Sequence, residues 1–101
     1  MSIVYVQIIN STRKEKKLMA KFYDDKRNKV KTTHFGSAGM SDYTKHKDDE
    51  RKKLYLARHK SNEDWNDYTT AGALSRWLLW HKQSLSASFN DYLKRFNLKK
   101  Y

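Results

Sequence analysis

The chain has 101 residues, a length that suits one folded domain around a single core and leaves no room for a second. It carries 22 Lys and Arg against 11 Asp and Glu, and the resulting net charge of +11 predicts polyanionic or acidic partners rather than small neutral substrates. The sequence contains no cysteine, which excludes disulfides, thiol nucleophiles and cysteine-based metal sites. We also expect neither a signal peptide nor a transmembrane helix, and hence action inside a cell or in a particle assembled there.

The first 35 residues have the alternation that is typical of strands. Residues 3–9 are β-branched and aromatic, residues 17–23 alternate apolar and polar side chains, and residues 30–35 are strand-like again. Polar stretches separate the three, which predicts an antiparallel meander over residues 1–35. Residues 36–46 hold two glycines and many polar side chains, which indicates a loop.

Residues 47–101 carry helical signals. Acidic residues at 48–50 and basic residues at 58–60 suit the two ends of a helix dipole and predict a helix over 47–59. Thr69 or Thr70 can cap a second helix, and Ser84 can cap a third. We therefore expect an α+β domain in which about three helices pack on one face of a small three-stranded antiparallel sheet. Helical periodicity places these apolar side chains in the core: Trp77, Leu78, Phe89, Leu93 and Phe96.

Most of the positive charge lies in residues 1–60, which hold 16 Lys and Arg against 7 Asp and Glu. The two turns between the predicted strands are especially basic, and could grip phosphates or dock on an acidic protein surface. Strand aromatics could add base stacking, although a domain of this length needs most of them for its core. The candidate binding residues are Arg13, Lys14, Lys16, Lys17, Lys26, Arg27, Lys29 and Lys31.

The sequence predicts no catalytic or metal site. Its four histidines are 12, 13 and 22 residues apart, a spacing that does not suit a metal. Glu50-Arg51-Lys52 is similar to part of a Mg²⁺-dependent nuclease set, but a helix would point Glu50 and Lys52 about 200° apart. Gly36 and Gly39 have the spacing of an RNA-binding clamp but follow a predicted strand, which favours a plain turn with positive φ. We expect no enzyme activity, no cofactor and no small-molecule substrate.

One set of short strings stands out between residues 34 and 96: His34-Phe35-Gly36, Asp42-Tyr43-Thr44, Trp65-Asn66-Asp67, Thr69-Thr70-Ala71-Gly72 and Ser75-Arg76-Trp77-Leu78-Leu79-Trp80. As a set they resemble a family of small, uncharacterised basic proteins of large nucleocytoplasmic DNA viruses. The resemblance implies a viral gene product with a similar fold. It transfers no catalytic residue to this chain.

Charge, size and resemblance together point to a non-catalytic structural protein of a virion. A minor capsid or cement component of this kind would dock on acidic surfaces of other capsid proteins. The alternative is a nucleic-acid-binding protein for genome packaging or regulation, whose basic surface would be interleaved with aromatics. Contact with an anionic membrane surface would suit the same charge. The sequence specifies neither the partner, the oligomeric state nor the virus, and leaves open whether Trp77 and Trp80 face the core or an interface.

Overall fold

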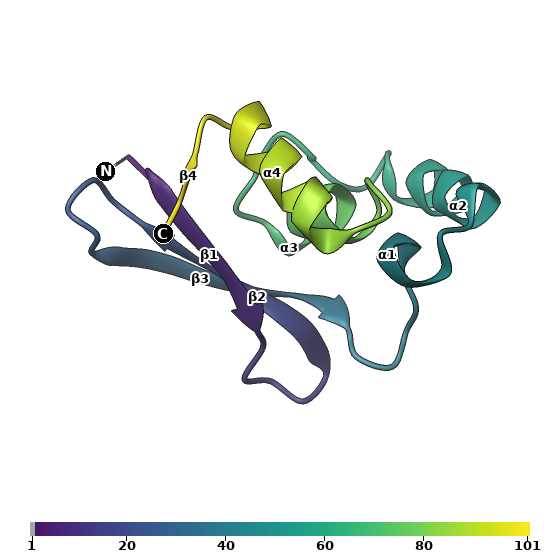
Figure 1. The fold of residues 1–101 in the computed structure, drawn as a ribbon. Helices are drawn as coiled ribbons and strands as arrows, with labels where there is room; N and C mark the ends of the chain where they lie inside the picture. Colours follow the sequence, from purple (N-terminus) through teal and green to yellow (C-terminus); the bar gives the residue numbers. More distant parts are fainter. Residues whose placement is uncertain (1) are drawn as a thin grey trace.

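A computed structural model describes residues 2–101 and shows an α+β architecture in which helices pack on one face of a four-stranded sheet (Figure 1). The sheet order is β3-β2-β1-β4. The three long strands begin and end within two residues of the predicted ranges, and the fourth lies at the C-terminus. Their bounds are β1 (Tyr5–Asn10), β2 (Lys16–Tyr23), β3 (Lys29–Ser37) and β4 (Lys99–Lys100).

The short strand β4 corrects the prediction of a three-stranded sheet. It runs parallel to β1, and the backbone N–H groups of Lys99 and Tyr101 donate to the carbonyls of Val4 and Val6 at 2.9 and 3.1 Å. This pairing returns the C-terminus to the sheet edge beside the N-terminal strand (Figure 1). The region predicted to be wholly helical therefore ends in a strand.

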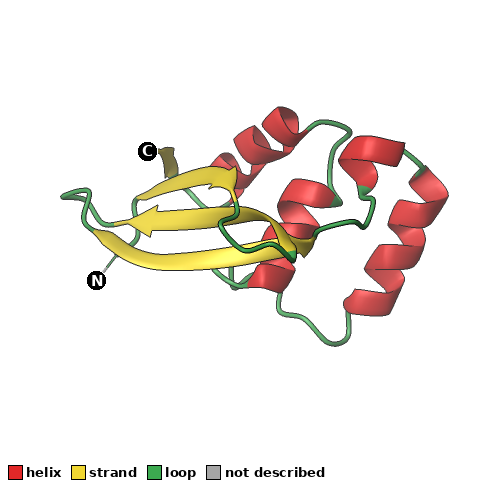
Figure 2. Ribbon diagram, turned by 90° about the horizontal axis from the view of Figure 1, so that it is seen from below, coloured by secondary structure: helices red, strands yellow, loops and turns green. Residues whose placement is uncertain are grey.

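The three long strands form the antiparallel meander that the sequence predicts. Val6 lies opposite Phe22, and Leu18 lies opposite Phe35, so their side chains share one face. Val6, Phe22 and Phe35 are fully buried there beneath the helices. In the described part of the chain, residues 2–101, no helix lies over the opposite face of the sheet (Figure 2).

Two helices follow the meander, and the first lies within the predicted loop. Helix α1 (Tyr43–His46) begins at Asp42, whose side chain accepts a hydrogen bond from the Thr44 N–H. Lys47 then adopts a left-handed conformation with φ 54°, so helix α2 (Asp49–His59) begins two residues later than predicted. In the same loop Gly36 and Gly39 have φ values of 77° and 85°, as expected for a plain turn.

The last helices begin at the predicted caps. The Thr70 hydroxyl caps helix α3 (Ala71–Leu74), which continues into a π-helical turn η1 (Ser75–Leu79). The Ser84 hydroxyl caps helix α4 (Leu85–Arg95). Among residues 2–101, no helix combines the length and the apolar character that crossing a bilayer requires.

The core lies between the helices and the sheet, and only part of the predicted core is fully buried. Trp77 and Leu78 are buried. The other three predicted core residues pack against the cluster but stay partly exposed: Phe89, Leu93 and Phe96. Helix α4 instead buries Tyr92, whose hydroxyl donates to the Tyr68 carbonyl at 2.7 Å. The buried face of α4 thus centres on Tyr92, and its apolar neighbours border that face.

Candidate functional site

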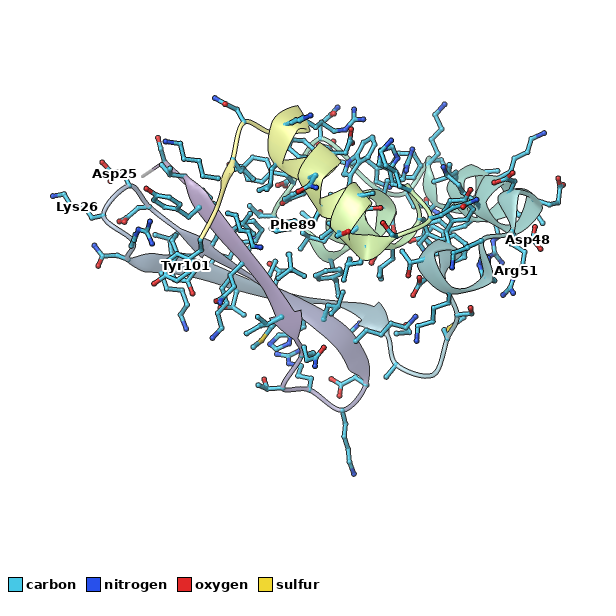
Figure 3. All side chains as sticks on the ribbon, in the orientation of Figure 1. Asp25, Lys26, Asp48, Arg51, Phe89 and Tyr101 are labelled. Carbon is cyan, nitrogen blue, oxygen red and sulfur yellow. The ribbon has the colours of Figure 1, made fainter. Side chains whose placement is uncertain are left out.

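The two basic turns do not form one surface, because they lie at opposite ends of β2. Figure 3 shows Lys26 of the second turn at the end of the molecule opposite Arg51 of α2. Two of the predicted binding residues are also engaged within the fold. Lys17 Nζ lies 2.6 Å from a carboxylate oxygen of Asp42, and Lys31 Nζ donates to the Thr69 hydroxyl at 3.0 Å.

A cleft of about 630 Å³ lies between the sheet end, α2 and the start of α3. Its cationic side chains come from separate parts of the chain: Lys16 from β2, and Arg51 and Arg58 from α2. Two apolar side chains beside them are unusually exposed, Met40 at 66% and Leu54 at 55%. The cleft therefore offers positive charge and apolar surface together.

A column of aromatic rings joins α2 to the rest of the fold. The Tyr55 ring stacks on Trp80 at 4.2 Å and on His59 at 4.1 Å, so it lies between the two. His46 approaches Trp80 at 5.3 Å. Burial raises the pKa of the Tyr55 hydroxyl to about 12. Since α2 contains no buried residue, this column is its main attachment to the body of the protein.

Both carboxylates of the cleft are already engaged by other side chains. Asp42 accepts hydrogen bonds from Lys17 and Thr44. Burial acts to raise the pKa of Asp42, but these bonds and the Lys17 charge outweigh it and hold the pKa below its ordinary value. Glu63 lies 3.1 Å from His59 Nδ1 and accepts from Trp65 Nε1 at 2.9 Å. The charges that remain available to a partner are the cations.

Gly72 makes room for this arrangement at the start of α3. A β-carbon at position 72 would lie 2.9 Å from the Glu63 carboxyl carbon, closer than two such atoms can approach. Position 72 must therefore lack a side chain if Glu63 is to reach both His59 and Trp65. Within residues 69–72, Thr70 therefore caps α3, and Gly72 leaves the space that the Glu63 side chain occupies.

The side chains of the nuclease-like string, residues 50–52, do not come together as a catalytic site. Glu50 is exposed in the first turn of α2, whereas Lys52 donates to the His81 carbonyl at 2.5 Å. Burial is the main cause that lowers the pKa of Lys52, and the nearby Arg76 charge adds to it. Among residues 2–101, no three His, Asp or Glu side chains gather as a metal site would require.

Sequence reasoning missed four residues of the cleft: Met40, Arg51, Leu54 and Arg58. Leu54 of α2 points away from the core and is exposed. The signal available beforehand was the thin apolar content of residues 47–59, which is too small to bury a helix. A helix of that composition leaves most of its side chains to solvent or to a partner.

One comparison with known proteins gave a result. Residues 6–59, just over half of the chain, match the model of a family of unknown function, DUF5754. The chain belongs to this family. The part that matches DUF5754 spans β1 to α2, which includes the basic wall of the cleft. No curated protein and no solved structure matches the chain.

Proposed function

We propose that this DUF5754 protein is a non-catalytic docking module that binds an acidic protein segment in the cleft between β2, α2 and α3. In a large DNA virus it would serve as a minor capsid or cement component. The observation that carries the proposal is the pairing of Arg51 and Arg58 with exposed Met40 and Leu54 in one concave surface. Such a surface matches a segment with carboxylates around an apolar anchor.

The apolar part of the cleft favours a protein partner over a nucleic-acid backbone. A phosphate backbone would use the cations but would gain nothing from Met40 and Leu54. Both faces of the Tyr55 ring are already covered, so this ring cannot stack on a base. A partner side chain placed against Leu54 would remove apolar surface from water, a gain of about 1.5–3 kcal/mol when burial is complete.

The viral setting rests on the resemblance of the strings described above. Several of these strings contribute residues that line the cleft: Gly36, Asp42, Gly72, Ser75 and Trp80. A small rigid domain with a basic, partly apolar cleft suits attachment to an acidic lattice. Electrostatic attraction would guide the encounter, and the apolar contacts would lower the rate of release.

The test uses substitutions on α2 that differ only in whether the side chain lines the cleft. Arg58→Glu reverses a cleft charge, and Lys53→Glu reverses an exposed charge of the same helix that does not line the cleft. Leu54→Ser removes the apolar contact and leaves the charge unchanged. Binding is measured with a labelled glutamate-rich peptide that carries one central phenylalanine, and incorporation is measured in purified virions.

We expect Arg58→Glu and Leu54→Ser each to weaken peptide binding about tenfold and to deplete the protein from particles, while Lys53→Glu has little effect. Equal losses from Arg58→Glu and Lys53→Glu would contradict a defined cleft, because only overall charge would then matter. Unchanged incorporation of the Leu54→Ser protein would contradict the role of the apolar surface.

Nucleic-acid binding, the alternative function, has its structural support elsewhere in the molecule. The opposite end of the sheet carries a cluster of tyrosines among lysines, of which Tyr101 is exposed. That surface is independent of the cleft.

A further inference from the structure

Three tyrosines gather on the uncovered face of the sheet, at the end opposite the cleft. Tyr101 stacks on Tyr23 with ring centroids 3.7 Å apart and planes 14° apart, and Tyr5 meets Tyr101 edge-on at 6.4 Å. The Arg27 guanidinium carbon lies 4.6 Å from the Tyr5 ring centre and 5.4 Å from that of Tyr101. We call Tyr5, Tyr23, Tyr101 and Arg27 the tyrosine platform. Tyr101 is its outermost ring and is 42% exposed.

The turn between β2 and β3 places Arg27 over the Tyr5 and Tyr101 rings. The buried Asp24 side chain accepts hydrogen bonds from the Lys26 and Asn28 N–H groups, each at 2.9 Å. Arg27 has φ 65°, in the left-handed region that a long side chain rarely adopts. Strain of this kind persists only where the surroundings enforce it, and it is concentrated at functional sites.

Positive charge surrounds the platform. Lys26 and Lys29 flank Arg27 in sequence, and Lys99 lies opposite Tyr5 in the pairing of β1 with β4. The nearest side-chain carboxylates along the chain are Asp24, which is engaged in the turn, and the exposed Asp25. Figure 3 shows Lys26 and Tyr101 at this same end of the molecule.

Hydrogen-bonding groups continue the same face towards the middle of the sheet. Gln7 accepts from the Tyr23 hydroxyl at 3.2 Å, which places both side chains on the uncovered face. Lys21 lies opposite Gln7, and Thr32 lies opposite Lys21, so these residues extend the face across three strands. No helix crosses this side of the sheet (Figure 2).

We propose that the tyrosine platform binds single-stranded nucleic acid, with an unpaired base against the exposed surface of Arg27 and Tyr101 and backbone phosphates along Lys26, Lys29 and Lys99. Aromatic rings beside a cationic track are what single-strand binding requires, because every base has a face that can stack. A duplex keeps its bases paired and stacked on one another, so it would offer the platform only its phosphates.

This inference does not rest on the proposed function of the cleft. The platform and the cleft lie at opposite ends of a molecule 42 Å long, and they share no residue. One protein could therefore hold a nucleic-acid strand at one end and an acidic protein segment at the other. The two activities can fail separately, since each has its own variants and its own probe.

The competing explanation is that Tyr101 acts only as a latch that keeps β4 beside β1. A latch would contribute to folding and would have no effect on nucleic-acid binding once the protein is folded. The experiment therefore compares affinity and thermal stability for the same variants, at a temperature where every variant is folded.

Binding is measured by fluorescence anisotropy with labelled oligothymidine and with a duplex of the same length. We expect wild-type protein to bind the single strand more tightly, Tyr101→Ala to weaken that binding about tenfold, and Tyr101→Phe to leave it within about twofold. Lys29→Gln should reduce the slope of log affinity against log salt by about 0.7. Lys60→Gln, an equal loss of charge beyond α2, should leave the slope unchanged.

Photocrosslinking gives a second result that requires no variant. Oligonucleotides that contain iodouracil should crosslink to the peptides of Tyr5 or Tyr101. Crosslinks that map only to α2 would overturn the proposal, as would equal affinity for single strand and duplex. A Tyr101→Ala protein that melts at a lower temperature but binds oligothymidine like wild type would show that the platform is only a latch. If the Tyr101→Ala protein instead fails to bind the glutamate-rich peptide, the platform would be assigned to a protein partner.

Discussion

The Lys17–Asp42 pair offers the sharpest test of how the cleft is held open. Asp42 is 1% exposed and connects two elements: it accepts from Lys17 of β2 at 2.6 Å, and from the Thr44 N–H at the start of α1. The loop that carries Met40 and Ser41 runs directly into this residue. Loss of the pair should therefore both destabilise the fold and loosen one wall of the cleft.

Asp42→Ala should lower the free energy of unfolding by about 3 kcal/mol. Removal of one partner from a buried ion pair costs about 3–5 kcal/mol, because the other charge is stranded. The loss of a helix cap adds about 0.5–2 kcal/mol. Lys17 has a long side chain that can move towards solvent, which favours the lower end of the range. For a domain of this size, such a loss corresponds to a fall in Tm of about 12–24 °C.

The assay is urea and thermal unfolding followed by circular dichroism, applied as a double-mutant cycle with Lys17→Met. In the double variant no charge is stranded, so it should be more stable than the Asp42→Ala protein. The coupling between positions 17 and 42 should exceed about 1 kcal/mol. A coupling below about 0.5 kcal/mol would refute the reasoning, because it would mean that Lys17 and Asp42 contribute independently.

The same pair should make stability depend on pH at the acidic end. The folded protein holds the pKa of Asp42 below its ordinary value of 3.8. Its stabilisation is therefore complete above the unfolded pKa and is lost as pH falls towards the lower, folded value. The Asp42→Asn protein should lose less stability than wild type between about pH 4 and pH 2. An identical acid profile for the two proteins would contradict this assignment.

Four further changes test other parts of the structure. Trp77→Ala should cost about 3–5 kcal/mol and leave little folded protein in a melting curve, because it empties a buried aromatic position. Gly72→Ala should displace Glu63 and shift the Trp65 indole N–H signal in NMR spectra, with a change in stability of less than about 1 kcal/mol because the flexible Glu63 side chain can move aside. Tyr55→Phe should remove a phenol titration near pH 12 from the ultraviolet absorbance curve. Arg27→Gly should change stability by less than about 0.5 kcal/mol in urea unfolding.

The sequence was sufficient for the elements that depend on local chemistry. Alternation of side chains located the three long strands, and the hydroxyls of Thr70 and Ser84 marked the starts of α3 and α4. These signals work because they act within a few residues. The left-handed backbone of Lys47, by contrast, has no local sequence signal. Because of this conformation, α2 begins at Asp49, two residues after the predicted start.

The elements that sequence reasoning missed depend on contacts with distant residues. Strand β4 is a Lys-Lys pair without any strand pattern, and it exists because the β1 edge supplies its hydrogen-bond partners. Helix α1 has only four residues and depends on Asp42, which is itself fixed by Lys17 of β2. No window of local sequence contains both partners of these contacts.

The sequence indicated that basic residues of the two turns form the binding surface, but it did not indicate where those turns lie relative to one another. Successive turns of a meander must lie at opposite ends of its middle strand, and the eight residues of β2 place the two basic turns about 25 Å apart. The positive charge therefore serves two separate surfaces. Lys16 lines the cleft, and Lys26 and Lys29 lie beside Arg27 of the tyrosine platform.

Arg27 shows most clearly how stability and surface function separate in this fold. Its left-handed backbone costs about 1 kcal/mol relative to glycine, and its contact with the Tyr5 and Tyr101 rings returns about 0.5–1 kcal/mol at an exposed site. The two contributions nearly cancel, so stability gives no reason to place arginine there. Arg27→Gly should thus fold as well as wild type and bind oligothymidine more weakly. A variant that instead lost more than about 1.5 kcal/mol of stability would show that the guanidinium is part of the packing, and the strain at this turn would then need no functional explanation.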